Sequence, residues 1–251
     1  MRILIVTVFT AFVCLVSFWM IKFWGRSQGY IEYHHPMYVV SEKPLLFIKP
    51  KFENMQQTLE QAENLFLDVA VTSDQKLVIP KKIWTTSEKP IRYSTLAEIQ
   101  DHVIDVQQMK ELLKTKKIIF NLIENAQAVH ENFLENMKQI GFEKGQNFIV
   151  TSPYEAPIKS LKDIAPALLF GTTQPEILKI VAMNSMGLIE AANIRADVVI
   201  HPLYLKKQLF FTDDLMAELK HRYKKIIVGP LSDSEKNQAM ELKPYGLIFE
   251  K

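Results

Sequence analysis

Short apolar runs that alternate with helix-like stretches constrain the fold of this 251-residue chain more than any other feature. After residue 44, most of these runs are too short for ordinary helices and are rich in Val, Ile, Leu and Phe, which is typical of strands. Eight strands are expected, at Leu45–Lys49, Phe66–Thr72 (with a companion at Leu77–Ile79), Ile118–Ile123, Asn147–Ser152, Ala167–Gly171, Ala196–Pro202, Lys225–Pro230 and Gly246–Glu250. Helices are expected between them, at Glu53–Glu63, Ser94–Lys114, Ala126–Ile140, Pro157–Ile164, Pro175–Met183, Thr212–Tyr223 and Ser232–Leu242.

This alternation predicts an α/β fold with a parallel sheet, because strands that are joined through helices pair in parallel by right-handed crossovers. Eight such strands fit a closed (β/α)8 TIM barrel, for which roughly 250 residues is typical. The alternative is an open doubly wound sheet, in which a Gly-rich phosphate loop would follow the first strand. The segment after that strand, KPKFEN, contains no glycine, so the barrel is favoured.

The chain opens with an uncharged apolar run, Ile3–Ile21, that predicts a transmembrane helix. As a helix it would be roughly 28 Å long, close to the thickness of a bilayer's hydrocarbon core. Trp19 and Trp24, with Lys22 and Arg26, follow the pattern of interfacial aromatic and cationic anchors. The alternative is a cleaved signal peptide, whose apolar region is usually about 7–15 residues long and ends in small residues. This run ends in FWMI, which favours an uncleaved anchor.

These segments predict a signal-anchor at residues 1–26, a linker at 27–43 and a barrel at 44–251. The positive-inside rule is nearly balanced across the helix, and we expect the barrel to be exported to the periplasmic or extracellular side, as in most signal-anchor proteins. The barrel contains no Cys, which agrees with an oxidising compartment. The first 26 residues hold three of the 30 basic side chains and none of the 28 acidic ones. The nearly neutral remainder gives no reason to expect nucleic-acid binding.

Several segments resemble the glycerophosphodiester phosphodiesterases. FLDVAVTSDQKLVI, followed by STLAEI, is similar to that family's second-strand region, which runs Glu-Leu-Asp-Val, Thr-Lys-Asp-Gly, a strand ending in His-Asp, and Leu-Thr-Leu-x-Glu-Leu. VTSPYEAPIKSLKDIAPALLFG, DVVIHP and KKIIVGPLSDSEKNQAMELKPYGLIFEK resemble its later strands. The resemblance covers roughly Pro44 to Lys251 and implies hydrolysis of glycerophosphodiesters to an alcohol and glycerol 3-phosphate. It also implies a divalent cation held by carboxylates, which neutralises developing charge, and two histidines for proton transfer.

The residues that carry this chemistry in the family are mostly replaced. The family's first histidine falls near Lys49, and its second aligns with Pro80 or Lys81. Phe66 replaces the Glu of the Glu-x-Asp pair, so that Asp68 alone remains. One carboxylate is too few for a hard divalent ion to which three would normally contribute. The pattern therefore indicates a pseudoenzyme without a metal cofactor.

The family's third-strand motif, Asn-Ile-Glu-x-Lys, is kept in part. Asn121 is present, Ile123 stands at the Glu position and Asn125 at the Lys position. Glu124 could serve as the missing carboxylate only after a shift of one residue.

Two functions remain open. In the first, a membrane-anchored, inactive barrel binds a phosphorylated small molecule, a lipid headgroup or a protein partner. Lys49, Lys51 and Lys81, together with Asn121, are its candidate ligand-binding residues.

In the alternative, the chain is an active hydrolase with a rearranged site that uses Ca²⁺ or Mg²⁺. Asp68 and Glu124 would hold the metal, and His201, at the end of the sixth strand, would transfer protons because imidazole titrates near neutrality. This function requires the three side chains to converge around one cation.

Overall fold

The structure is a computed structural model, in which residues 2–27, 29–38, 43–81, 89–125, 128–142 and 147–251 are described. Eight parallel strands lie side by side in the order β7-β6-β5-β2-β1-β12-β11-β8. They are β1 (Leu45–Lys49), β2 (Asn64–Val71), β5 (Lys117–Leu122), β6 (Phe148–Thr151), β7 (Leu169–Phe170), β8 (Val198–His201), β11 (Lys225–Leu231) and β12 (Gly246–Glu250). The two ends of this row meet at a parallel bridge between Gly171 and Val198. The predicted TIM barrel is thereby confirmed.

The interior of the barrel is packed with side chains, one from each of the eight strands. They are Phe47, Phe66, Ile119, Ile149, Leu169, Val198, Ile227 and Ile248, and all are buried. Because side chains alternate along a strand, the residues next to them in sequence point outward to the helices. The barrel therefore has a solid apolar core and no central pore.

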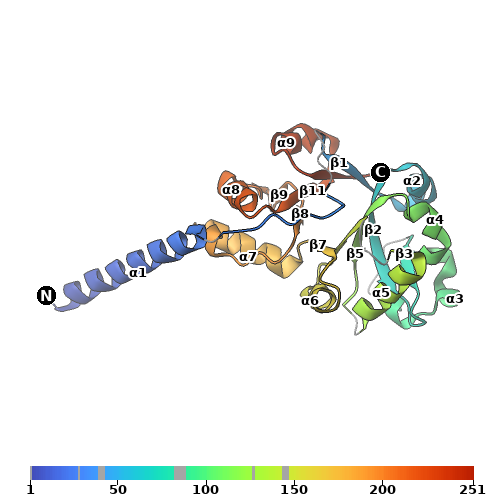
Figure 1. Cartoon of the computed structure of the whole chain (residues 1–251), viewed down its shortest axis with the longest axis horizontal. Helices are drawn as coiled ribbons and strands as arrows, with labels where there is room; N and C mark the ends of the chain where they lie inside the picture. Colours follow the sequence, from blue (N-terminus) through green and yellow to red (C-terminus); the bar gives the residue numbers. More distant parts are fainter. Residues whose placement is uncertain (1, 28, 39–42, 82–88, 126–127, 143–146) are drawn as a thin grey trace.

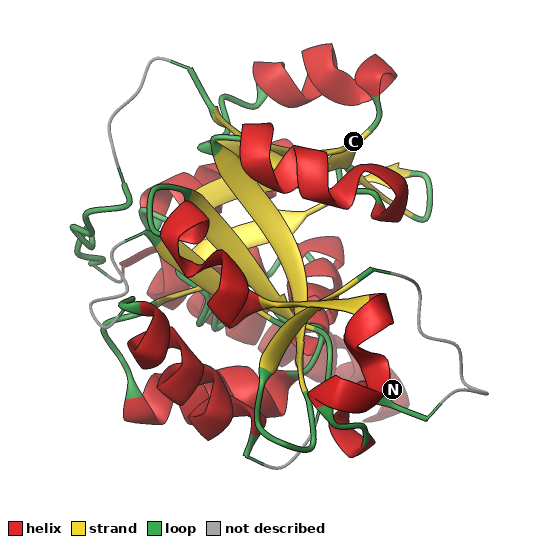
Figure 2. Cartoon of the chain, turned by 90° about the vertical axis from the view of Figure 1, so that its right-hand side faces the viewer, coloured by secondary structure: helices red, strands yellow, loops and turns green. Residues whose placement is uncertain are grey.

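Helices surround the strands, as Figure 2 shows. They are α2 (Met55–Gln61), α3 (Leu96–Ile99), α4 (Lys110–Leu113), α5 (Val129–Ile140), α6 (Glu155–Ile164), α7 (Gln174–Ser185), α8 (Asp213–His221) and α9 (Lys236–Glu241). Side-chain caps fix where some of them begin: the hydroxyl of Thr173 accepts from the N–H of Glu176, and that of Thr212 from the N–H of Leu215. A small hairpin of β9 (Tyr204–Leu205) and β10 (Gln208–Leu209) follows β8.

The expected single helix at Ser94–Lys114 is wrong. A capping box at Thr95 starts α3, but the chain then forms β4 (Val103–Asp105) before α4 begins. β4 pairs antiparallel with β3 (Leu77–Pro80), which in turn pairs antiparallel with the end of β2. Pairing with an available strand and burial of Val103 against Val78 outweigh the helical pattern of the surrounding residues.

The N-terminal helix α1 (Arg2–Ser27) projects from the barrel (Figure 1) and contains one candidate membrane span, Ile5–Phe23, whose side chains are not buried. A signal sequence near the N-terminus can meet the same criteria of length and hydropathy. The last turns of α1 contact a short 3₁₀ turn, Ile189–Ala191. The ammonium of Lys22 lies 3.7 Å from Oε1 of Glu190, and a Cβ at Gly25 would lie 2.5 Å from the carbonyl oxygen of Glu190.

Residues 29–38, which lie within the expected linker, cross the end of the barrel where the strands begin. The hydroxyl of Tyr33 donates to the carbonyl oxygen of Ala167, and that of Tyr245 donates to the carbonyl oxygen of Met37. The Met37 side chain is fully buried against the interior ring. This segment closes the N-terminal end of the barrel and leaves the opposite end as its mouth.

Candidate functional site

Three side chains from neighbouring strands meet at the mouth of the barrel. The ammonium of Lys49 lies 3.0 Å from Oδ2 of Asp68, and the amide of Asn121 donates to Oδ1 of Asp68 over 2.7 Å. Lys49 and Asp68 are partly exposed, at 28% and 29% of their side-chain surface. All three are candidate site residues predicted from the sequence, and the structure brings them together.

Strand alternation explains why they meet. Lys49, Asp68 and Asn121 each stand two residues after an interior side chain of β1, β2 and β5, so they form the next layer toward the mouth. The parallel register of β2 and β5 places Asp68 directly beside Asn121.

The same layer continues on the other side of the barrel with residues that the sequence analysis missed. The side chains of Thr151 and Ile200 lie against Gly171, where a Cβ would be 2.8 Å from each. The hydroxyl of Thr151 donates to the carbonyl oxygen of Thr172. Thr151, Gly171 and Ile200 each stand two residues after an interior side chain. This spacing is the sequence signal that could have identified them.

The mouth does not fit a divalent cation held by carboxylates. Both oxygens of Asp68 are engaged, one by an ammonium and the other by an amide donor. Ca²⁺ and Mg²⁺ require several oxygen ligands. Within the described ranges, no group of three His, Cys, Asp or Glu side chains could hold a metal. The ammonium of Lys49 already neutralises the negative charge that Asp68 would offer to a metal.

Glu124, just after β5, contacts a different part of the molecule. Its Oε1 accepts from the backbone N–H of Arg92 over 3.2 Å, and its Oε2 is buried without a hydrogen-bond partner among the described residues. Burial raises the pKa of Glu124, and the hydrogen bond and charge of Arg92 only partly oppose that rise. Glu124 therefore faces the turn that contains Arg92.

His201 is held at the end of β8. Its Nδ1 lies 2.8 Å from the carbonyl oxygen of Pro202, and its ring stacks on Phe210 with 4.0 Å between centroids. Burial lowers its pKa, so the neutral imidazole is favoured. Asp68, Glu124 and His201 thus each have separate partners, and the convergence that the hydrolase alternative requires is not seen.

Lys51 and Lys81 follow two other strand ends. Lys51 is exposed just beyond β1, and its N–H donates to the carbonyl oxygen of Lys251. Lys81 is half-buried just beyond β3, and its N–H donates to the carbonyl oxygen of His102. The backbone of each is fixed by these bonds.

No protein-family model matches the sequence, and no curated protein matches it. Solved structures do match. A glycerophosphoryl diester phosphodiesterase domain from Mycobacterium tuberculosis superposes with a TM-score of 0.64 at 9% identity, covering 82% of this chain and 96% of that one. A glycerophosphodiester phosphodiesterase from Parabacteroides distasonis gives 0.61 at 14% identity, covering 83% and 93%. The chain has the fold of the glycerophosphodiester phosphodiesterases.

A third structure with this fold was solved with a small molecule. It is an Oleispira antarctica phosphodiesterase in complex with the product sn-glycerol-3-phosphate, with a TM-score of 0.57 at 12% identity, covering 82% of this chain and 92% of that one. At these identities the likeness establishes the fold of the phosphodiesterase-like barrel, while function must be inferred from the residues at its mouth.

Proposed function

We propose that the chain is a membrane-anchored, catalytically inactive phosphodiesterase-like barrel that binds a phosphate-bearing small molecule or lipid headgroup at its mouth. One observation carries this proposal: both oxygens of Asp68 are engaged, by Lys49 and by Asn121. A metal would have to displace the Lys49 ammonium before it could bind.

Inactivity follows from the chemistry of phosphodiester cleavage. The reaction needs a cation that neutralises charge on the phosphate and a group that protonates the leaving oxygen. The fixed ammonium of Lys49 could attract a phosphate. His201, however, is stacked on Phe210 and has its own partner at Pro202.

Ligand binding is supported by the cations near the mouth. Lys49 and Asn121 both contact Asp68 in the site, and Lys51 and Lys81 follow the ends of β1 and β3. Lysine binds phosphate as a point charge, and asparagine adds amide donors. Glycerol 3-phosphate is the natural probe, since it occupies a protein of the same fold.

The anchor is supported by α1, whose apolar side chains in the Ile5–Phe23 span are not buried against the barrel. We propose that α1 remains attached and that the barrel lies on the exported side. Intact mass in the membrane fraction tests attachment: the uncleaved chain is 29.1 kDa. A reporter at the C-terminus tests the side, and a shortened soluble product or a cytoplasmic signal would contradict the proposal.

The decisive assay is hydrolysis of glycerophosphocholine and glycerophosphoethanolamine by the full chain in detergent, with Ca²⁺, Mg²⁺ or a chelator. We expect no release of glycerol 3-phosphate under any of these conditions. Metal-dependent release that disappears in Asp68→Ala would establish the hydrolase alternative.

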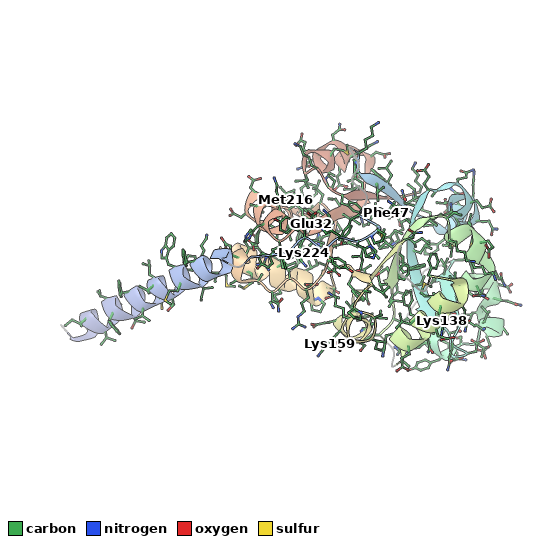
Figure 3. All side chains as sticks on the ribbon, in the orientation of Figure 1. Glu32, Phe47, Lys138, Lys159, Met216 and Lys224 are labelled. Carbon is green, nitrogen blue, oxygen red and sulfur yellow. The ribbon has the colours of Figure 1, made fainter. Side chains whose placement is uncertain are left out.

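Calorimetric titration of glycerol 3-phosphate tests binding. The double variant Lys51→Gln/Lys81→Gln should weaken binding by roughly thirtyfold, because two charge-assisted contacts of about 1 kcal/mol each are lost. Lys110→Gln/Lys138→Gln, on α4 and α5, removes the same charge elsewhere and is the matched control; Figure 3 labels Lys138. It should bind as the parent does. Equal affinities for all three proteins would rule out Lys51 and Lys81 as ligand-binding residues.

A further inference from the structure

A cavity of about 590 Å³ lies at the end of the barrel opposite the mouth. Four lysines line it: Lys220 on α8, Lys224 and Lys225 at the start of β11, and Lys243 before β12. None of the described residues that line it is an Asp or Glu. Its volume is within the usual range for small-molecule sites, roughly 300–1,000 Å³.

The positive charge of the cavity is only partly balanced by its surroundings. The ammonium of Lys225 lies 3.4 Å from Oε1 of Glu32, on the segment that closes the barrel. Lys220 and Lys243 are exposed, with no ion pair among the described residues. Figure 3 labels Glu32 and Lys224 on the side of the barrel from which α1 departs.

Lys224, like Lys225, is half-buried, whereas Lys220 and Lys243 are exposed. Burial lowers the pKa of Lys224, and the nearby cations Lys162 and Arg222 add to that effect. The attraction of Asp197 and Glu176 offsets it only in part. A buried ammonium is stabilised by an anion placed beside it, because the anion replaces the hydration that burial removes.

Two tyrosines form an apolar wall behind the lysines. The ring of Tyr38 lies 5.4 Å from the ammonium of Lys225, and it packs edge-on against the ring of Tyr245. The hydroxyl of Tyr245 is held by the carbonyl oxygen of Met37, so this wall is fixed. Apolar walls with a few polar groups are typical of small-molecule sites.

The cavity lies close to the end of α1. Ala217 on α8 lines both this cavity and a smaller hollow that includes Glu190. Glu190 is the residue that contacts Lys22 and Gly25 of α1. One helix, α8, therefore separates the lysines from the point where α1 meets the barrel.

We propose that this lysine-lined cavity is a second anion site, which binds the phosphate group of a soluble phosphate compound or of a phospholipid headgroup. It is distinct from the mouth, because it is built from the opposite ends of the strands. Its position beside α1 allows a headgroup to reach it from a membrane.

Titration of inorganic phosphate into the full chain, held in a non-ionic detergent, tests the site. The variant Lys220→Gln/Lys243→Gln should bind phosphate roughly tenfold more weakly than the parent. Both side chains are exposed, so folding should be unaffected; unchanged thermal unfolding checks this. The control Lys110→Gln/Lys138→Gln removes the same charge from α4 and α5 and should bind as the parent does.

Two further arms identify the location and source of the phosphate. The mouth variant Lys51→Gln/Lys81→Gln should keep the phosphate affinity that the cavity variant loses, whether or not the mouth binds glycerol 3-phosphate. In nanodiscs, phosphatidylglycerol should abolish phosphate binding to the cavity if a headgroup occupies it, whereas phosphatidylcholine should not. Persistent binding in both nanodiscs supports a soluble phosphate. No phosphate binding by the parent, or equal affinity in the cavity variant and its control, overturns the proposal.

Discussion

The ammonium of Lys49 lies 3.0 Å from Oδ2 of Asp68 at the mouth of a phosphodiesterase-like barrel. The carboxylate of Asp68 would otherwise attract a cation from solution. It is paired instead with the ammonium of Lys49 on the neighbouring strand, β1. The amide of Asn121 holds the other oxygen. This pairing turns a candidate metal ligand into part of a basic, hydrogen-bonded surface.

A double-mutant cycle should detect this pair. For Lys49→Met and Asp68→Asn we expect a coupling energy of about 0.5–1 kcal/mol, because the side chains are only partly exposed. The control is the more exposed pair Lys114–Glu111 on the surface near α4, for which about 0.2–0.5 kcal/mol is expected. Thermal unfolding of the full chain in detergent provides the measurement. A coupling no larger than that of the control would mean that the pair is not fixed.

Met37 should contribute strongly to stability, because its side chain is fully buried against the interior ring of the barrel. Met37→Ala leaves a cavity there and should cost about 2–5 kcal/mol in free energy of unfolding. Met240→Ala, at an exposed position on α9, should change it by about 0.5 kcal/mol or less. If both variants unfold at the same temperature, residues 29–38 are not an integral part of the barrel.

The strand pattern could be predicted because each strand is a short run of branched and aromatic residues. β1 and β12 have the expected bounds, and the other barrel strands differ by a few residues at their ends. The sequence alone could not show that the helix expected at Ser94–Lys114 is interrupted. Its interruption by β4 depends on pairing with β3, which local propensity does not reveal.

The candidate site could be predicted in part for a similar reason. Lys49, Asp68 and Asn121 are at strand ends, and parallel register brings such residues together. The partners of Glu124 and His201 come from the turn at Arg92 and from Phe210, and no sequence spacing indicates these contacts. The cavity at the opposite end combines α8 with the starts of two strands, so it became visible only in the folded chain.

Gly229 on β11 should not tolerate a side chain. Its φ of 146° is one that other residues rarely adopt, and a Cβ there would lie 2.5 Å from the carbonyl oxygen of Ile248. Gly229→Ala should therefore lower the free energy of unfolding by about 2 kcal/mol or more. Gly29→Ala, with no atom within 4 Å of the added Cβ, is the control and should be nearly neutral. Wild-type stability in Gly229→Ala would show that β11 can shift away from β12.

Stability should depend on pH through Glu124. Burial raises its folded-state pKa above the ordinary value of 4.5, so the protonated form is favoured in the folded chain. The stability that this preference for the protonated form contributes is fully present below pH 4.5. It is lost as the pH rises through the folded-state pKa.

Glu124→Gln, which stays neutral, should therefore gain thermal stability relative to the parent as the pH rises from 4.5 toward neutrality. Glu135→Gln, at an exposed position on α5, is the control and should show no such trend. A difference between Glu124→Gln and the parent that is constant with pH would contradict the raised pKa.

The bond between Tyr245 and Met37 joins residues 208 positions apart, and β1 pairs along its whole length with β12, the last strand. During synthesis, one edge of β1 therefore stays unpaired until β12 has left the ribosome. If α1 is inserted in the membrane before β12 is synthesised, the unpaired edge of β1 is held beside the bilayer. The barrel can therefore close only after β12 has been synthesised, however early its other strands have paired.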